Sequence, residues 1–152
     1  MAKYNIKEKK EKSPVYRTLV SDEVLERLKA RITEEIVVNQ KYKVKEYSAA
    51  QLARDLNTNT RYISAAVNVC FGVNYSEFVN KFRVRDAKSI LADKRYNPLG
   101  ISDVADIVGF SNRQSFYAAF YRFTGVTPRK YRIESQGMGP NDTPVGIADD
   151  GE

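Results

Sequence analysis

Two short segments of the chain carry polar side chains whose types and spacing suit hydrogen bonding to a partner. They are Arg61, Ser64 and Asn68 in the first segment and Arg113, Gln114 and Tyr117 in the second. Arginine can pair bidentately with guanine, asparagine and glutamine with adenine, and alanine methyls such as those of Ala65 and Ala118 with the thymine methyl. The alternative is a merely solvated polar face. Because these positions of the two segments include no acidic side chain, the interpretation that they read base edges is favoured.

A second group of side chains could hold phosphate groups. Its members are Ser111, Arg122, Thr127, Arg129, Lys130 and Arg132. Arginine and lysine pair with phosphate oxygens, and the free backbone amides at a helix start bind anions. Ordinary surface charge is the alternative for each basic side chain taken alone.

Composition excludes most catalytic chemistry. The 152 residues include no histidine and one cysteine, Cys70, which removes most metal sites, Ser–His and Cys–His nucleophile pairs and any intramolecular disulfide. We therefore expect no enzymatic activity, no catalytic residue, no metal and no cofactor. The net charge of +6 and the pI of about 9.4 favour a polyanionic partner. No apolar run approaches the roughly 20 residues of a membrane span. We therefore expect no membrane partner and a cytoplasmic location.

The chain contains an internal repeat. At an offset of 53 positions, Ile63 aligns with Phe116 and Gly72 with Gly125, and slightly earlier, at an offset of 52, Leu52 aligns with Val104. Each copy reads as a helix, a short turn and a second helix, which is the helix-turn-helix pattern. Two copies in one chain indicate contact with two places on a repeating partner, for which double-stranded DNA is the expected molecule.

Helix boundaries follow from capping residues and from apolar residues at three- and four-residue steps. The expected caps are Ser21, Ser48, Thr58, Asn74, Ser102, Ser111 and Thr127. The stripe Phe116, Phe120 and Phe123 is expected in the core, as is Cys70 on the equivalent side of the first copy. No strand signal is present, so the predicted fold is all-α.

Charge and breaker residues set the domain organisation. Residues 1–17, with six Lys/Arg and two Glu, form a basic arm that we expect to be flexible; a role in reaching DNA phosphates is the sharper alternative. Residues 18–134 form the folded domain, with a first unit at about 21–74, a linker helix at about 75–95 and a second unit at about 101–133. Residues 135–152, rich in Gly, Pro and Asp, are expected to be disordered.

The second copy and the linker resemble a known family. The matching elements are A-x-x-V-G-F-S at 105–111, S-F-x-x-x-F at 115–120, G-x-T-P-x-x-Y-R at 125–132, and Y-S-E-F-V-N-K-F-R-V-R-D-A-K-S-I-L at 75–91. They are similar to the DNA-binding domain of the arabinose-regulator (AraC/XylS) family of bacterial transcription factors.

This resemblance implies about seven helices in two helix-turn-helix subdomains, which insert their recognition helices into adjacent major-groove segments. It makes RNA polymerase a candidate second partner. Family members often carry a basic residue where this chain has Ala65 and Ala118, and the helix from 60 to 71 has only one base, Arg61. A protein-interaction module that keeps the fold without DNA affinity is therefore the competing hypothesis. No effector domain is visible, so the chain is either a stand-alone regulator or the output module of a longer protein.

Overall fold

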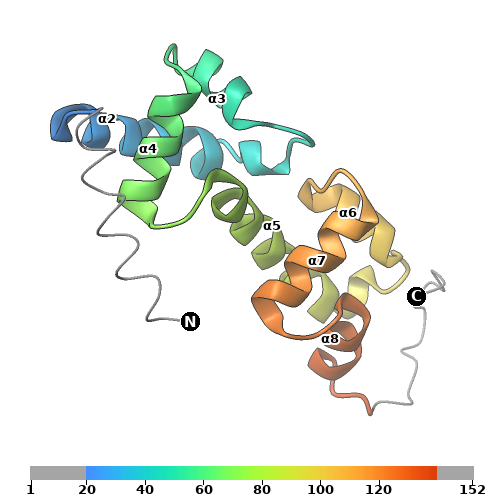
Figure 1. Cartoon of the computed structure of the whole chain (residues 1–152). Coiled ribbons are helices and arrows are strands. Elements are labelled where there is room, and N and C mark those ends of the chain that lie inside the picture. Colours follow the sequence, from blue (N-terminus) through green and yellow to red (C-terminus); the bar gives the residue numbers. More distant parts are fainter. Residues whose placement is uncertain (1–19, 140–152) are drawn as a thin grey trace. The chain divides into compact units, whose positions relative to one another are not determined.

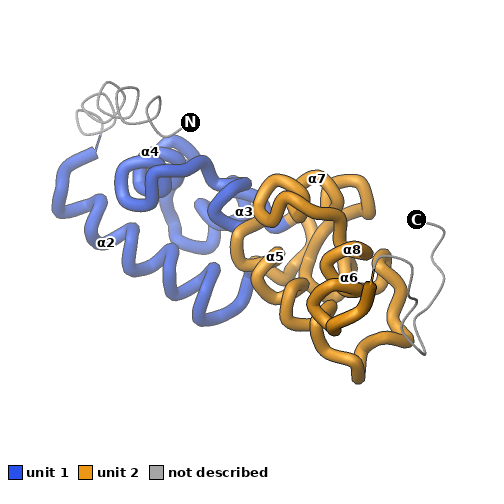
Figure 2. Tube along the Cα trace, turned by 90° about the horizontal axis from the view of Figure 1, so that it is seen from below, with its two compact units in different colours: residues 1–41, 47–79 blue, residues 42–46, 80–152 orange. Residues whose placement is uncertain are grey.

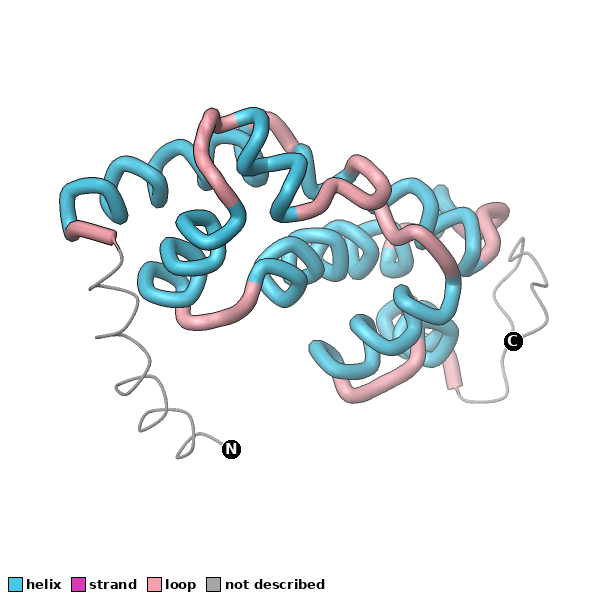
Figure 3. The backbone as a smooth tube through the Cα atoms, turned by 45° about the horizontal axis from the view of Figure 1, so that its top comes forward, coloured by secondary structure: helices cyan, strands magenta, loops and turns pink. Residues whose placement is uncertain are grey.

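The computed structural model describes residues 20–139, and within this range it is all-helical (Figure 1). Seven α-helices, α2–α8, are joined by loops and by short 3-10 and π-helical turns, and no strand occurs between residues 20 and 139 (Figure 3). The all-α prediction is confirmed. The predicted arm at 1–17 lies outside the described residues, as does most of the predicted tail.

The chain divides into two compact units (Figure 2). The first comprises residues up to Lys41 together with Tyr47–Val79, and the second comprises Tyr42–Glu46 together with the chain from Asn80 onward. Helix α5 (Tyr75–Ala92) is one continuous element of 18 residues that contributes to both units. The short segment Tyr42–Glu46 thus belongs to the second unit although it lies within the sequence of the first.

The first unit is a three-helix bundle followed by the start of α5. Its helices are α2 (Asp22–Thr33), which a π-helical turn extends to Val38, α3 (Ala49–Asp55) and α4 (Thr60–Phe71). Helices α2 and α3 both pack on α4. The Tyr47 hydroxyl donates a hydrogen bond to Asp55 and holds the pKa of that carboxyl below its usual value.

The second unit repeats this bundle. The later part of α5 supplies its first helix, followed by α6 (Ile101–Val108), α7 (Arg113–Thr124) and α8 (Pro128–Ser135). The core positions of α2 have counterparts 59 residues later in α5, with the same steps of three and four residues. They are Leu25, Leu28 and Ile32 in α2 and Val84, Ala87 and Leu91 in α5, all of them buried. The predicted linker is therefore also the first helix of the second unit.

The repeat predicted from the sequence is confirmed in the helices themselves. Helices α4 and α7 each have 12 residues and start 53 positions apart, and each ends on a left-handed glycine, Gly72 or Gly125, with φ near 80°. Glycine tolerates this backbone conformation because it has no Cβ. The turn between the paired helices differs, since it contains Asn57 (φ 58°) in the first unit and Gly109 (φ 110°) in the second.

Capping residues set the helix starts, and three of the expected caps are wrong. Asn59 and Asn112, rather than Thr58 and Ser111, cap α4 and α7 by accepting a hydrogen bond from the third amide of the helix. These asparagines stand directly before the first helical residue in extended backbone, which is the geometry that capping requires. Ser102 lies inside α6, whose start is instead fixed by Asp103 accepting from the Gly100 amide. The caps at Ser21, Ser48, Asn74 and Thr127 are confirmed.

Polar contacts fasten the segment Tyr42–Glu46 to its own unit. Arg83 donates from Nε to the Tyr42 carbonyl at 2.6 Å, and the buried Tyr42 hydroxyl donates to Asp86. Burial, together with this hydrogen bond, raises the pKa of the Tyr42 phenol. Lys45 forms an ion pair with Asp106 of α6. The segment therefore covers the α6–α7 turn at its glycine.

Replacement of two glycines separates backbone strain from steric overlap. A Cβ at Gly109 would lie 2.5 Å from the Tyr42 carbonyl oxygen and 2.8 Å from the Lys43 Cα, whereas no described atom lies within 4 Å of a Cβ at Gly125. Gly125→Ala should lower the free energy of unfolding by about 1–2 kcal/mol through its positive φ. Gly109→Ala should cost about 1–3 kcal/mol more because the backbone must move.

Urea unfolding of the two variants beside the parent chain measures both losses, provided that the denaturant dependence is unchanged. Equal losses would show that the segment Tyr42–Glu46 is not held against the turn.

Candidate nucleic-acid interface

Helix α7 buries one side and exposes the other. Phe116 and Phe120 are fully buried and pack edge-to-face on one another, with ring centroids 5.6 Å apart. Burial of an aromatic side chain contributes about 1.5–3 kcal/mol, more than an exposed hydrogen bond, so these residues fix the rotation of the helix. Phe123 is an exception to the predicted stripe, because 42% of it is exposed. It shares the direction of the buried residues but stands in the last turn of α7, which ends at Thr124.

Of the three predicted base-reading residues of the second unit, Gln114 is exposed, whereas Arg113 and Tyr117 are half-buried and Tyr117 packs against the core. Gln114 and Ala118 are exposed, and Tyr121, one turn further along the helix, is 59% exposed. Arg113 is half-buried and donates from Nη2 to the Tyr117 hydroxyl at 3.2 Å, while its guanidinium lies over the Tyr117 ring at 5.2 Å from the centroid. The arginine is thus held in place beside Gln114 before any partner binds.

The exposed side of α4 covers a smaller part of the helix surface than that of α7. Arg61 and Ser64 are exposed and Asn68 is half-buried, but Ala65 is fully buried. The expectation that Ala65 faces a partner, as Ala118 does 53 positions later, is wrong for this residue. The buried sector of α4 is wider than that of α7, because Ala65 joins Ile63, Ala66 and Val67 in it.

Asn68 has one polar atom turned inward. Its Oδ1 is buried and accepts no hydrogen bond from the described residues. The amide nitrogen is therefore the polar group of Asn68 that remains for an external acceptor. In the first unit, Arg61, Ser64 and this single amide group make up the predicted base-reading set.

The predicted phosphate-binding residues gather in the second unit around the two ends of α7 and the start of α8. Ser111 and Arg122 are exposed, and Arg129 is half-buried. Thr127 accepts a hydrogen bond from the Lys130 amide at 3.2 Å, which uses one amide of the helix start that could otherwise face an anion. The Lys130 ammonium lies 3.9 Å from Glu134, in an exposed pair that contributes little and leaves the cation accessible.

Arg132 is a correction to the sequence analysis. Only 1% of it is exposed, and it donates to the Leu99 carbonyl at 2.8 Å and to the Tyr96 carbonyl at 3.1 Å. The buried guanidinium therefore ties α8 to the loop before α6 and does not face solvent. Beside it, Gln136 donates to Asn97 and to the Leu91 carbonyl, so the packed part of the unit extends to Gln136.

Sequence reasoning missed three cations on α5: Lys81, Arg85 and Lys88. They line a cleft of the second unit together with residues of α7 and α8. The signal was present, because steps of four and three residues place side chains on one face of a helix. The resemblance of this segment to a linker helix gives no reason to expect a cleft beside it.

Residues 20–139 contain no group of three or more His, Cys, Asp or Glu side chains that could hold a metal ion. Within the same described range, no helix is both long and apolar enough to cross a membrane.

The fold and the exposed faces define a protein with two helix-turn-helix units. A family model described as "Helix-turn-helix domain" matches residues 52–133, which is more than half of the chain. The HTH-type transcriptional regulator YtdP of Bacillus subtilis is 31% identical over 93 residues, which are 61% of this chain and 12% of that protein. The chain therefore spans a small part of the length of the curated relatives it matches.

Two solved structures share the fold at 22% sequence identity. The C-terminal domain of the two-component response regulator yesN from Fusobacterium nucleatum matches with a TM-score of 0.59, covering 68% of this chain and 97% of that one. The C-terminal domain of AraT, a response regulator from Geobacillus stearothermophilus, also has a TM-score of 0.59 and covers 79% and 90%. The chain belongs to the AraC-type helix-turn-helix family of transcriptional regulators, as the sequence motifs predicted.

The structural role of Arg132 can be tested by substitution. Arg132→Met keeps the apolar stem but removes the donors to the Leu99 and Tyr96 carbonyls, and we expect the free energy of unfolding to fall by about 2–4 kcal/mol. Lys130→Met, on the exposed side of the same helix, is the control and should change it by less than about 0.5 kcal/mol. Urea unfolding measures both. A loss for Arg132→Met as small as that of the control would contradict the assignment.

Proposed function

We propose that the chain binds double-stranded DNA sequence-specifically and regulates transcription, with α4 and α7 entering adjacent major-groove segments. The single observation that carries this proposal is the face of α7 on the second helix of a helix-turn-helix unit, where Gln114 and Ala118 are exposed beside the half-buried Arg113 and Tyr117. A recognition helix offers the side chains of its first turns to base edges. Neither α4 nor α7 contains an acid that would repel phosphates.

In this proposal the roles divide between the residues as predicted from the sequence. The base-reading residues are Arg61, Ser64, Asn68, Arg113, Gln114 and Tyr117, and the phosphate-binding residues are Ser111, Arg122, Thr127, Arg129 and Lys130. The second unit contributes more to specificity than the first, because α4 exposes fewer polar side chains than α7.

The length of α5 supports contact with adjacent groove segments. Its 18 residues span about 27 Å at 1.5 Å per residue. Major-groove segments on one side of B-DNA recur at about 34 Å, so a spacer of this length suits neighbouring turns, with some bending of the DNA. We also propose a cytoplasmic location and, during activation, a contact with RNA polymerase. Membership of a regulator family rather than an enzyme family agrees with the expectation of no enzymatic activity.

Gln114 should determine part of the sequence preference. Gln114→Ala should cost about 1–3 kcal/mol at one or two base pairs and relax the preference there, because a bidentate contact with a base is lost. A binding selection from randomised duplexes reports the preference directly. An unchanged preference in the variant would remove Gln114 from the base-reading set.

Arg129 should act on all sequences alike. Arg129→Ala should weaken binding to every duplex by a similar factor and reduce the slope of log affinity against log salt by about 1, because one phosphate contact is lost. Gln114→Ala is the matched control, since it should leave that slope unchanged. A salt titration by fluorescence anisotropy measures the slopes. Binding by the parent chain that does not fall with salt would instead favour a protein-interaction module.

A further inference from the structure

The two units contain the same groove, between the first helix and the end of the recognition helix. In the first unit it has a volume of about 410 Å³, lined by Asp22, Leu25, Glu26 and Lys29 of α2 and by Val69 and Cys70 of α4. In the second unit α5 and α7 line a groove of about 540 Å³, which Tyr131 of α8 closes at one side. A shift of 59 residues aligns the four α2 residues of the first lining with four α5 residues of the second, and a shift of 53 aligns Cys70 with Phe123. Val69 aligns with Arg122, which does not line the second groove.

The charge of this groove is inverted between the two copies. Asp22, Glu26 and Lys29 of the first unit correspond to Lys81, Arg85 and Lys88 of the second. Two acids and one base have become three bases, while the apolar position between them is kept as Leu25 or Val84. None of the nine residues lining the second groove is acidic. We call this second groove the basic cleft.

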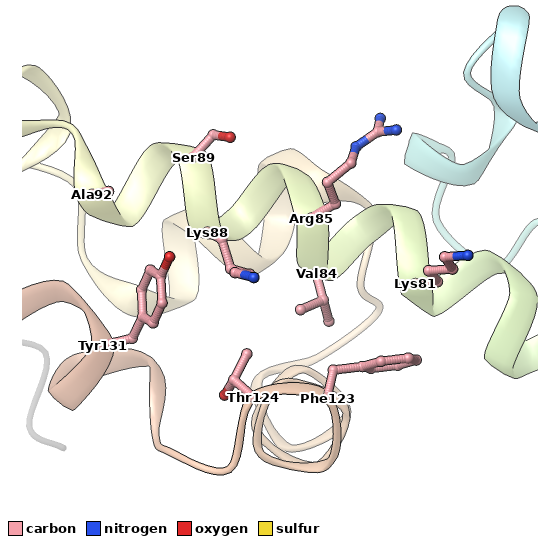
Figure 4. Close-up of a pocket in the computed structure, with 9 residues that line it drawn as sticks. All are labelled: Lys81, Val84, Arg85, Lys88, Ser89, Ala92, Phe123, Thr124 and Tyr131. Carbon is pink, nitrogen blue, oxygen red and sulfur yellow. The ribbon is translucent and has the colours of Figure 1, made fainter. Parts of the chain in front are cut away.

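The basic cleft has an apolar floor and cationic edges (Figure 4). Val84 and Lys88 point from α5 toward Phe123 and Thr124 at the end of α7, and the Tyr131 ring stands beside them. The Lys88 ammonium lies 6.0 Å from the centroid of that ring. Such a cleft suits an extended chain that carries both apolar and acidic side chains.

Two of the three cations are available. Arg85 is engaged, because its guanidinium pairs with Asp86 at 3.2 Å and donates to the Tyr42 hydroxyl. Lys81 and Lys88 are exposed, and neither forms an ion pair with any described residue. A pair of uncompensated ammonium groups beside apolar surface attracts carboxylates.

We propose that the basic cleft binds the acidic segment 140–152 of the same chain. This segment contains four acids, Asp142, Asp149, Asp150 and Glu152, and no base. It also contains Val145 and Ile147, two apolar side chains spaced for one side of an extended strand. The apolar pair contacts the exposed Phe123 ring, and the carboxylates pair with Lys81 and Lys88.

The connection to the fold places the segment within reach of the cleft. Tyr131, which lines the cleft, lies on α8, the last helix before the segment. Gln136 donates from Nε2 to the Leu91 carbonyl at 2.9 Å, next to Ala92 of the cleft lining, and the Met138 amide donates to the Ile133 carbonyl at 3.1 Å. Residues 140–145 can extend over about 20 Å, at roughly 3.4 Å per residue. This length exceeds the span of the cleft along α5, which is about 16 Å between Lys81 and Ala92.

The cleft is separate from the proposed base-reading residues. Gln114 and Phe123 are nine residues apart on α7, which is about 13 Å along the helix axis. Docking of the segment does not require DNA binding, so this inference stands apart from the proposed function.

Paramagnetic relaxation enhancement tests the contact in the full chain without DNA. A nitroxide is attached through Gly151→Cys after the natural thiol has been removed by Cys70→Ala. At low salt, the amide signals of Phe123, Thr124 and Tyr131 should lose more than half of their intensity relative to the reduced label. The loss should disappear at 0.5 M salt, because the screening length is then only about 4 Å and exposed charges attract one another weakly.

Charge variants show whether the contact is specific. Lys81→Glu with Lys88→Glu should restore the signals, whereas Lys29→Glu with Lys94→Glu, which changes the net charge equally at other exposed sites, should not. Replacing Asp142, Asp149 and Asp150 by Asn should also restore them and leaves the helices untouched.

Undiminished signals at low salt, or equal effects of the two lysine pairs, would overturn the proposal. A third outcome would also overturn the proposal. If the amide signals of the cleft residues shift on addition of inorganic phosphate but are not weakened by the label on the segment, the cleft binds an external anion instead.

Discussion

Complete burial of one side of α4 and of α7 is the constraint on which the rest of this structure depends. Ile63, Ala66 and Val67 in the first unit and Phe116 and Phe120 in the second are almost entirely removed from water. Because each large apolar side chain contributes about 1.5–3 kcal/mol on burial, a rotation of either helix would be costly. The polar side chains opposite are consequently held at fixed positions, which a reader of base edges requires.

Duplication explains the architecture, and divergence explains how the two units differ. Both copies retain the bundle, the 12-residue second helix and its glycine stop. They differ in what surrounds that helix. Ala65 is buried, whereas its counterpart Ala118 is exposed. Cys70, whose thiol faces the Leu25 carbonyl, corresponds to Phe123, which is 42% exposed. The grooves beside these positions carry opposite charge. The second unit thus has both a more polar exposed helix face and a cationic cleft.

Much of this fold could be predicted from the sequence, because repeat spacing and helical periodicity depend on local order. Gly72 and Gly125 marked the helix ends, and Ser21, Ser48 and Thr127 marked starts. The choice between adjacent capping candidates, such as Ser111 and Asn112, depends on the residue at which the helix starts, and helix ends are uncertain by one or two residues from the sequence. The burial of Ala65 and Arg132 depends on contacts from distant elements, which periodicity does not encode. Arg132 in particular has a side chain of the type that binds phosphate, but it is buried and donates to a backbone carbonyl.

The predicted site residues that the structure leaves accessible form a coherent set in the second unit and a sparse one in the first. The central claim is that both sets read DNA from a single chain. Selection of bound duplexes from a fully randomised pool tests it most directly. If both sets read DNA, two half-sites should be enriched, with centres about 10–10.5 base pairs apart and a stronger preference in the half-site bound by the second unit. Recovery of no enriched sequence, or of one half-site alone, would contradict it.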